Sequence, residues 1–188
     1  MTKPVHSQMA RIGQALASPV RVRALNLLAQ RAWTIGELAE ELGESLASAS
    51  AHLKVLRASC LVVDEKVGRQ VWCRVASVEV MQLLLATRAA AEALLPELRE
   101  FIRLTKESPS SLQEMTLEEL TKELAAQRVM LVDLRPENEY LAGHLPGALS
   151  LPVELIPFID RAKFSDFSHI VAYCRGPYCA LAREGTEA

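Results

Sequence analysis

The spacing of apolar residues changes near residue 107. This change predicts two domains of different fold class, one on each side of that position. Before it, apolar residues recur mostly at helical spacing, with two β-rich runs at Leu61–Glu65 and Val71–Val75. After it, short apolar runs alternate with helical stretches, which predicts a parallel α/β sheet. We expect a first domain over residues 1–106, a Ser- and Pro-containing linker over 107–115 and a second domain over 116–188.

The two parts also differ in charge and therefore in the partners they suit. Residues 1–107 carry a formal net charge of +3 and residues 108–188 one of −5, which predicts different roles. The 4 cysteines are too few for a disulfide scaffold in 188 residues. No stretch approaches the ~20 apolar residues of a membrane span, and no signal peptide is recognised. We expect a cytoplasmic protein with reduced thiols and no membrane partner.

The first domain carries the signals of two helices joined by a tight turn. Thr34 and Glu37 form a capping box that starts one helix, and Gly43 is placed to end it. The next helix begins at Ser45 or Ser48, and the two β-rich runs that follow predict a hairpin. This order predicts an α+β winged helix-turn-helix domain, mostly α-helical, whose second helix enters the major groove of DNA.

The helix after the turn has an apolar face, with Leu46, Leu53 and Leu56 predicted to point inward. On the remaining surface, serine hydroxyls suit bases or phosphates, and Lys54 and Arg57 suit phosphates. The hairpin tip suits the adjacent DNA backbone or minor groove. The residues expected to contact DNA are Ser48, Ser50, Ala51, His52, Lys54 and Arg57 on the helix, and Lys66 and Arg69 at the tip.

A single long helix is expected over Val78–Lys106, with a kink at Pro96. Its apolar residues alternate at spacings of four and three, the heptad pattern of a helix–helix interface. They are Val80, Leu84, Thr87, Ala91, Leu94, Leu98 and Phe101. We favour a dimer helix, because the small domain before it offers little core to cover so long a stripe. An ordinary core helix is the alternative.

The segment Ser50–Arg57 (SAHLKVLR), followed by Leu61-Val62, resembles the recognition helix and wing entry of the ArsR family of small dimeric bacterial repressors. The resemblance covers about residues 8–105 and implies a homodimer on a palindromic operator in double-stranded DNA. Many members of that family bind metals through cysteines on the third helix, but Glu37–Leu42 contains none. Because the histidines are also scattered, we expect no metal site and no cofactor.

The second domain carries motifs that are separated in the chain. They are residues 132–136 (VDLRP), Glu139-Tyr140, residues 143–148 (GHLPGA) and residues 173–179 (YCRGPYC). Together they resemble the rhodanese signature and its active-site loop, which implies an α/β rhodanese-like domain with Cys174 as the catalytic cysteine. We interpret the signature residues Asp133, Arg135, Glu139 and His144 as architectural rather than catalytic.

Cys174 follows a predicted strand and precedes a loop and a helix. Loop N–H groups and the positive end of the helix dipole are expected to lower its thiol pKa from about 8.5 toward neutrality. The thiolate then takes sulfane sulfur from a small donor such as thiosulfate or a persulfide, and Arg175 attracts an anionic donor. Cys179 either attacks the Cys174 persulfide as a resolving thiol or is a small buried residue of the first helical turn.

Further sequence features limit the reactions that this chain is expected to perform. Cysteine phosphatases use a similar loop with arginine six positions after the cysteine, but Ala180 stands there, which argues against phosphatase chemistry. A rhodanese domain continues well beyond its loop, whereas this chain ends at Ala188, so we expect a truncated fold with unpaired sheet edges and poor turnover. Cys60 and Cys73, near the hairpin, are interpreted as inert thiols, with a redox pair as the alternative.

Three functions fit these observations. The favoured one is a DNA-binding transcriptional regulator, a repressor, that responds to sulfur or redox chemistry at the rhodanese-type cysteine. The second is a thiosulfate-type sulfurtransferase that forms a Cys174 persulfide, with the DNA-binding half giving location only. The third is a constitutive DNA-binding protein with a vestigial rhodanese domain.

Overall fold

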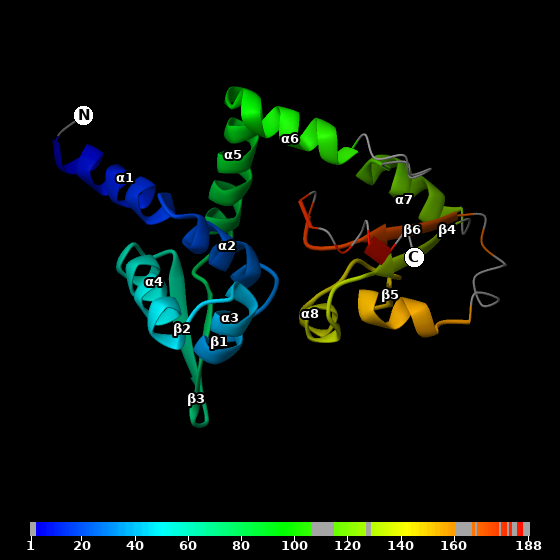
Figure 1. Ribbon diagram of the computed structural model, residues 1–188, viewed down its shortest axis with the longest axis horizontal. Helices are drawn as coiled ribbons and strands as arrows, with labels where there is room; N and C mark the ends of the chain where they lie inside the picture. The colour runs from blue at the N-terminus through cyan, green and yellow to red at the C-terminus, as the bar shows by residue number, and fades with distance from the viewer. Residues whose placement is uncertain are drawn as a thin grey trace. The chain divides into compact units, whose positions relative to one another are not determined.

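Figure 1 shows the computed structural model, which describes residues 3–106, 115–126, 129–160, 167, 169–176, 178–179, 181 and 184–185. The chain divides into two compact units, Met1–Glu107 and Ser108–Ala188, which we call the N-terminal and the C-terminal unit. The linker expected over 107–115 lies outside the described residues except for Met115. No helix among the described residues is long and apolar enough to cross a membrane.

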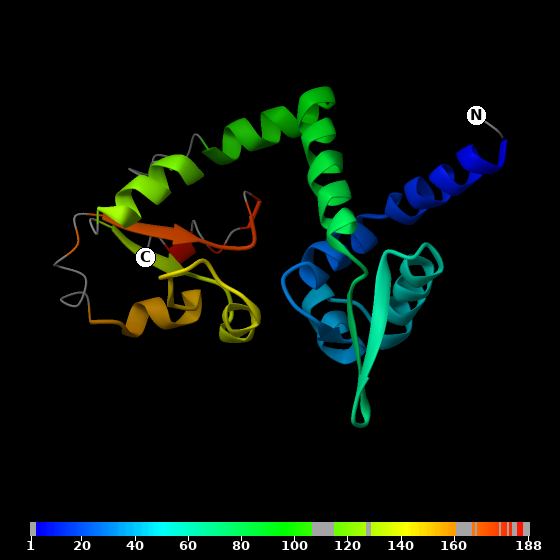
Figure 2. The same ribbon diagram turned by 180° about the vertical axis from the view of Figure 1, so that it is seen from behind.

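The N-terminal unit is a winged helix-turn-helix, as predicted. It contains α1 (Lys3–Leu16), α2 (Pro19–Leu28), β1 (Trp33–Thr34), α3 (Ile35–Leu42), α4 (Leu46–Ala58), β2 (Val62–Val67), β3 (Gln70–Val75), α5 (Val78–Leu94) and α6 (Pro96–Lys106). The strands form an antiparallel sheet in the order β1-β3-β2. Figure 2 shows β2 and β3 projecting from the helices as a narrow hairpin, the wing.

The predicted capping signals are confirmed. Thr34 and Glu37 form a complete capping box at the start of α3, in which the Thr34 hydroxyl accepts from the Glu37 N–H. Gly43 ends α3 in the left-handed conformation, with φ of 69°. Of the two serines considered for α4, Ser45 is the cap, and its hydroxyl accepts from the Ser48 N–H at 3.1 Å. Local hydrogen bonds therefore fix the turn between α3 and α4.

The inward placement predicted for Leu46 is wrong. Ala49, Leu53 and Leu56 of α4 are buried at 1% exposure or less, whereas Leu46 is 61% exposed. Leu46 is the first residue of α4, and helical side chains tilt toward the N-terminus of their helix. Its side chain consequently projects beyond the core, and the buried stripe of α4 begins one turn later.

The hairpin is tighter than the sequence suggests. Its strands reach Val67 and Gln70, which pair directly, so that only Gly68 and Arg69 form the turn. Gly68 has φ of 62°, a conformation that favours glycine at the first central position of a two-residue hairpin turn. Lys66 therefore lies in β2 beside the turn, and Arg69 lies in the turn itself.

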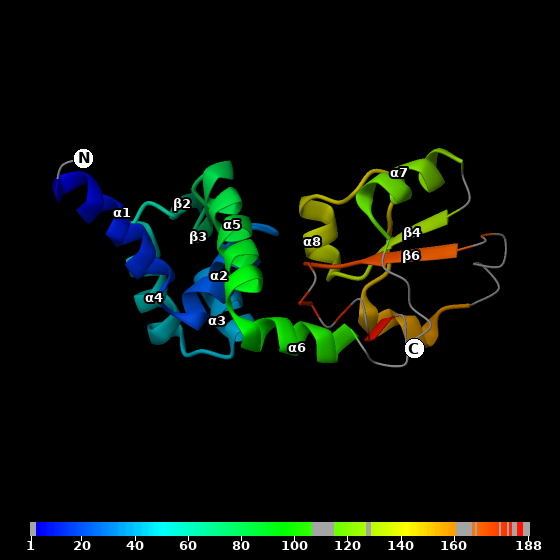
Figure 3. The same ribbon diagram turned by 90° about the horizontal axis from the view of Figure 1, so that it is seen from above.

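The single kinked helix expected over Val78–Lys106 is instead two helices. α5 ends at Leu94, Leu95 is extended with φ of −101° and ψ of 107°, and Pro96 begins α6. A residue before proline is pushed out of the helical region, because the proline ring collides with its backbone, so the chain turns here. Figure 3 shows α6 leaving the end of α5 at a steep angle.

The C-terminal unit is built on a small parallel sheet in the order β5-β4-β6, which confirms the predicted α/β class. Its elements are α7 (Leu117–Ala125), β4 (Val129–Asp133), α8 (Glu137–Ala142), β5 (Leu149–Ser150), the 3₁₀ helix η1 (Val153–Phe158) and β6 (His169–Tyr173). Within this unit, α7 lies on one face of the sheet and η1 on the other (Figures 1 and 3). Parallel strands place their carboxyl ends at one edge, and Asp133 pairs with Tyr173. This pairing brings together two of the rhodanese-like motifs, the one that contains Asp133 and the one that begins at Tyr173.

Candidate functional site

The structure leaves most of the predicted DNA-contacting residues of α4 accessible. Ser50, Ala51 and Lys54 are exposed, and Ser48 and His52 are half-buried. Small side chains on this face allow close approach to a groove, where hydroxyl and ammonium groups find bases and phosphates. Lys66 and Arg69 are exposed at the wing tip.

Arg57 differs from the other predicted DNA contacts. Its Nε donates to Asp64 Oδ1 at 2.8 Å and its Nη2 donates to Cys73 Sγ at 3.2 Å. Asp64 and Cys73 are cross-strand partners in β2 and β3, so the half-buried guanidinium ties α4 to the wing. This role depends on the strand register, which the sequence alone does not show.

Cys60 and Cys73 are not cross-strand partners. Cys73 pairs with Asp64 across the hairpin, whereas Cys60 lies before β2, which begins at Val62. Cys60 follows the end of α4 with φ of 58°, and the N–H of the next residue, Leu61, donates back to Leu56 O at 3.0 Å. Burial raises the pKa of the Cys73 thiol, and Asp64 raises it further. These placements favour two inert thiols over a redox pair.

Replacing Lys54 by Ala is expected to weaken binding to specific and random DNA alike. Lys54 is an exposed cation on α4, the helix predicted to enter the major groove, so its loss is expected to remove about one phosphate contact. The slope of log K against log salt should fall by roughly one unit. Fluorescence anisotropy over a salt series measures this slope. Lys122→Ala, an exposed lysine of α7, is the control, and an unchanged slope for Lys54→Ala would place Lys54 away from DNA.

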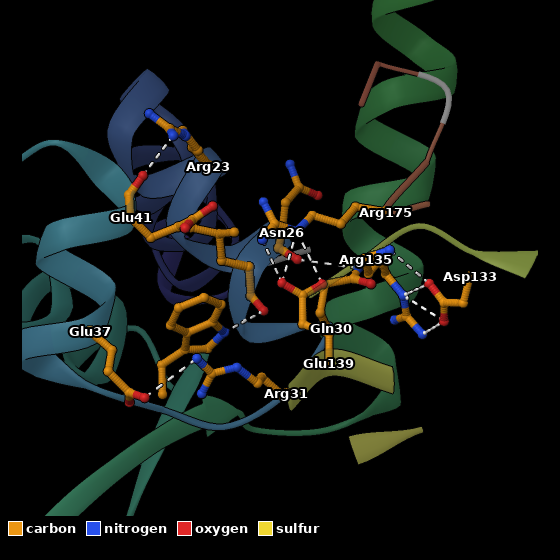
Figure 4. Close-up of polar contacts among 12 residues, drawn as sticks. Arg23, Asn26, Gln30, Arg31, Glu37, Glu41, Asp133, Arg135, Glu139 and Arg175 are labelled. Atoms are coloured by element: carbon orange, nitrogen blue, oxygen red, sulfur yellow. Dashed lines mark hydrogen bonds and ion pairs between the residues drawn. The ribbon is translucent and has the colours of Figure 1, made fainter. Parts of the chain in front are cut away.

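In the C-terminal unit, two buried carboxylates each hold an arginine (Figure 4). Asp133 is fully buried and accepts from Arg135 Nη2 at 2.6 Å and Nε at 2.9 Å, and Arg135 also donates to Gly143 O at 2.7 Å. Hydrogen bonds from Arg135 and from the Tyr173 hydroxyl outweigh burial and hold the pKa of Asp133 below its usual value. Asp133 and Arg135 thus lock the end of β4.

The second pair anchors the loop that contains Cys174. Glu139, on α8 and fully buried, accepts from Arg175 Nη2 at 2.5 Å and from Arg175 Nε at 2.9 Å. Arg175 immediately follows Cys174, so this bidentate pair fixes the first residue of the loop to α8. Arg175 was predicted to attract an anionic donor, whereas the structure pairs it with Glu139.

His144 has a structural setting. Its ring stacks on Tyr140 with centroids 3.8 Å apart, and its Nδ1 lies 2.9 Å from Tyr140 O. The Tyr140 hydroxyl in turn donates to Ala148 O at 2.9 Å, which holds the Gly-His-x-Pro-Gly turn against α8. Among the described residues, no group of His, Cys, Asp and Glu is placed to hold a metal ion.

Cys174 and Cys179 lie together within the loop. The Cys174 thiol donates to Gly176 O and to Cys179 O, each at 3.7 Å, and the Cys179 N–H donates to Gly176 O at 3.0 Å. The single S–H of Cys174 can instead turn toward the Cys179 sulfur. That hydrogen bond, together with the N–H groups of Arg175 and Leu181, lowers the pKa of Cys179 to about 6. The loop N–H groups were predicted to surround Cys174, whereas those of Arg175 and Leu181 donate to Cys179.

Alkylation of Cys179 by iodoacetamide is expected to rise through a midpoint near pH 6, the pKa of its thiol. Only the thiolate reacts, so acidification below this midpoint slows the reaction, whereas an ordinary thiol needs a pH of about 8.5. Trypsin cleaves after Arg175 and separates Cys174 from Cys179, so mass spectrometry reads each site. A midpoint of about 8.5 for Cys179 would contradict the described hydrogen bonds.

Comparison with known proteins agrees with this architecture. The rhodanese-like domain family matches residues 116–187, and a helix-turn-helix domain family matches residues 16–65. The HTH-type transcriptional regulator Rv0324 of Mycobacterium tuberculosis is 36% identical over 176 residues, which cover 93% of this chain and 76% of that protein. The HTH-type transcriptional regulator CmtR of Mycobacterium bovis is 45% identical over 65 residues, which cover 35% of this chain and 55% of that protein.

Two solved structures resemble the N-terminal part of the chain. The homodimeric winged helix-turn-helix DNA-binding domain of Mb0332 from Mycobacterium bovis is 30% identical with a TM-score of 0.48, and covers 52% of this chain and 93% of that chain. Rv0081 of Mycobacterium tuberculosis is 28% identical with a TM-score of 0.48, and covers 51% and 97% respectively.

The fold and the motifs define a DNA-binding transcriptional regulator. More specifically, the chain belongs to the family of the HTH-type transcriptional regulator Rv0324, and it combines an ArsR-type helix-turn-helix domain with a C-terminal rhodanese-like domain.

Proposed function

We propose that this regulator is a homodimeric cytoplasmic repressor that binds a palindromic operator and responds to sulfane sulfur taken up at Cys174. The observation that carries the proposal is the loop after β6, where Cys174 and Cys179 share hydrogen bonds beside the Glu139–Arg175 pair. A loop that is built around two thiols on a regulator suits chemical sensing better than packing alone.

The uptake step needs only a thiolate and a donor with a weak S–S bond. The Cys174 thiolate attacks the outer sulfur of thiosulfate, the S–S bond of thiosulfate breaks, and sulfite leaves with the bonding electron pair. Cys174 then holds a persulfide. The proton of the Cys174 thiol passes along its hydrogen bond to the Cys179 sulfur, which lies next to it. Cys179 is thus the base that activates Cys174.

Arg175 supports this step by position. Its guanidinium is paired with the buried Glu139, and its side chain keeps 21% exposure. The pair attaches the residue after Cys174 to α8, and the backbone N–H of Arg175 is one of the donors to Cys179. We therefore assign Arg175 and Glu139 as positioning residues for the two thiols.

The dimer part of the proposal rests on apolar side chains left on the helices outside the winged core. Met9 of α1 is 61% exposed, Leu94 of α5 is 74% exposed, and Phe101 of α6 is 61% exposed. Covering such residues drives association, and a two-fold dimer matches a palindromic operator.

Treatment of the full chain with thiosulfate or glutathione persulfide tests the uptake of sulfur. Intact and peptide mass spectrometry should find one added sulfur atom on Cys174 while the other thiols are unchanged, or the product that a second thiol makes from it. Cys174→Ser should abolish the modification, and Cys60→Ser, at an exposed thiol of the N-terminal unit, should not. Sulfur carried by Cys60 or Cys73 in place of Cys174 would contradict the proposal.

A further inference from the structure

The loop after β6 folds back so that its two cysteines meet. Cys179 follows Cys174 by five residues, yet the Cys174 Sγ lies 3.7 Å from Cys179 O and donates to the Cys179 sulfur. The Cys179 N–H closes the turn on Gly176 O at 3.0 Å. Both thiols are half-buried, so neither is fully surrounded by solvent.

We infer that Cys179 is the resolving thiol of Cys174, and that the sulfur-loaded regulator proceeds to an intramolecular Cys174–Cys179 disulfide with release of sulfide. The inference rests on the proposed uptake of sulfur at Cys174 and adds the step that follows uptake. The disulfide, rather than a stable persulfide, is then the form of the loop that persists after sulfur uptake.

The chemistry balances without an added oxidant. After uptake, the proton that Cys179 accepted from Cys174 passes to the outer sulfur of the new persulfide, so Cys179 is again a thiolate. The inner sulfur of the protonated persulfide is the Cys174 Sγ. The Cys179 thiolate attacks that Sγ, a Cys174–Cys179 S–S bond forms, and the bond to the outer sulfur breaks. The outer sulfur leaves as hydrosulfide with its proton and the electron pair. The sulfane sulfur is thereby reduced to sulfide while the two cysteine sulfurs are oxidised to the disulfide.

The surroundings of Cys179 suit a nucleophile. Its sulfur accepts from the backbone N–H groups of Arg175 and Leu181, which favour the thiolate. Arg175 is held by Glu139 through two short hydrogen bonds, so its N–H is fixed next to Cys179. The attacking group and its target are thus held in one turn, which replaces a bimolecular encounter by a local one.

The other two cysteines do not offer this chemistry. Cys73 is fully buried beside Arg57 and Asp64, and burial raises the pKa of its thiol. Cys60 is exposed at the end of α4, four residues along the chain from the partner of Cys73. Within the N-terminal unit, neither has a second thiol at its side.

The test uses the full chain, reduced and freed of reductant, with glutathione persulfide as the donor. Released sulfide is trapped and quantified, and the protein is alkylated and digested with trypsin. Cleavage after Lys163, Arg175 and Arg183 puts Cys174 and Cys179 on separate peptides, residues 164–175 and 176–183, so a disulfide appears as their covalent adduct. Wild type should release about one sulfide per chain and yield this adduct. Cys60→Ser should behave as wild type.

One variant result and two wild-type results distinguish the possible outcomes. Cys179→Ser, and independently Cys179→Ala, should keep a persulfide on Cys174 and lower sulfide release by about tenfold or more. A wild-type protein that holds a stable Cys174 persulfide and releases no sulfide would overturn the inference while leaving sulfur uptake intact. A wild-type protein that takes up no sulfur at Cys174 would overturn both, and circular dichroism shows whether each variant is folded.

Discussion

Replacing Glu139 by Gln is expected to destabilise the C-terminal unit by about 3 kcal/mol. Glu139 is fully buried and accepts both hydrogen bonds from Arg175, so its loss leaves a guanidinium without its counter-charge. Breaking one partner of a buried ion pair costs roughly 3–5 kcal/mol, and the partial exposure of Arg175 places this case at the low end. The first residue of the loop then loses its attachment to α8.

The two units report separately on this variant. Both tryptophans, Trp33 and Trp72, lie in the N-terminal unit, so tryptophan fluorescence during urea unfolding follows that unit alone. Hydrogen exchange of β4 and β6 peptides follows the other. The Glu139→Gln change should accelerate exchange in β4 and β6 and leave the fluorescence transition in place. Glu137→Gln, an exposed position of the same helix, is the control, and equal exchange in both variants would refute a structural role for the pair.

Placing Asp at both Leu94 and Phe101 is expected to give monomers and to weaken operator binding by about 100-fold or more, because a monomer engages one half-site only. Both side chains are largely exposed, at 74% and 61%. Leu84 of the same heptad pattern packs against the core of the N-terminal unit, so a charge there would unfold the domain instead.

Sedimentation velocity measures the oligomeric state, and anisotropy with a palindromic fragment measures the affinity. Ala93→Asp is the matched control, since it adds a charge at an exposed position next to Leu94 on another side of α5. A double variant that stays dimeric would show that α5 and α6 do not form the interface.

Features set by neighbouring residues were predictable from the sequence. The capping box of Thr34 and Glu37 and the left-handed Gly43 depend only on residues within one turn, and the structure has both. The sequence also contained the cause of the break at Leu95, because Pro96 disfavours a helical conformation in the residue before it. The strong apolar periodicity nevertheless favoured one continuous helix. The burial of Leu46 was predicted wrongly, because the spacing of apolar residues along a helix does not show where the core ends.

The fine geometry of the candidate sites was not predictable in this way. Arg57 meets Asp64 and Cys73 through a hairpin register, and Arg175 meets Glu139 across 36 positions of sequence. Which cysteine receives the loop N–H groups depends on backbone directions that a motif does not encode. The motif places two thiols in one loop, and only the structure assigns the donors to Cys179.

Sulfur uptake at Cys174 is expected to change DNA binding, and the affinity for DNA before and after sulfur treatment tests this coupling. A DNA fragment is selected from a random-sequence pool with the reduced full chain, and its affinity is measured before and after treatment with glutathione persulfide, for wild type and for Cys174→Ser. We expect a loss of affinity of about 10-fold or more in wild type, typical of a coupling free energy of about 1–3 kcal/mol, and none in Cys174→Ser. The same affinity before and after treatment in wild type, or the same loss in both proteins, would contradict this coupling.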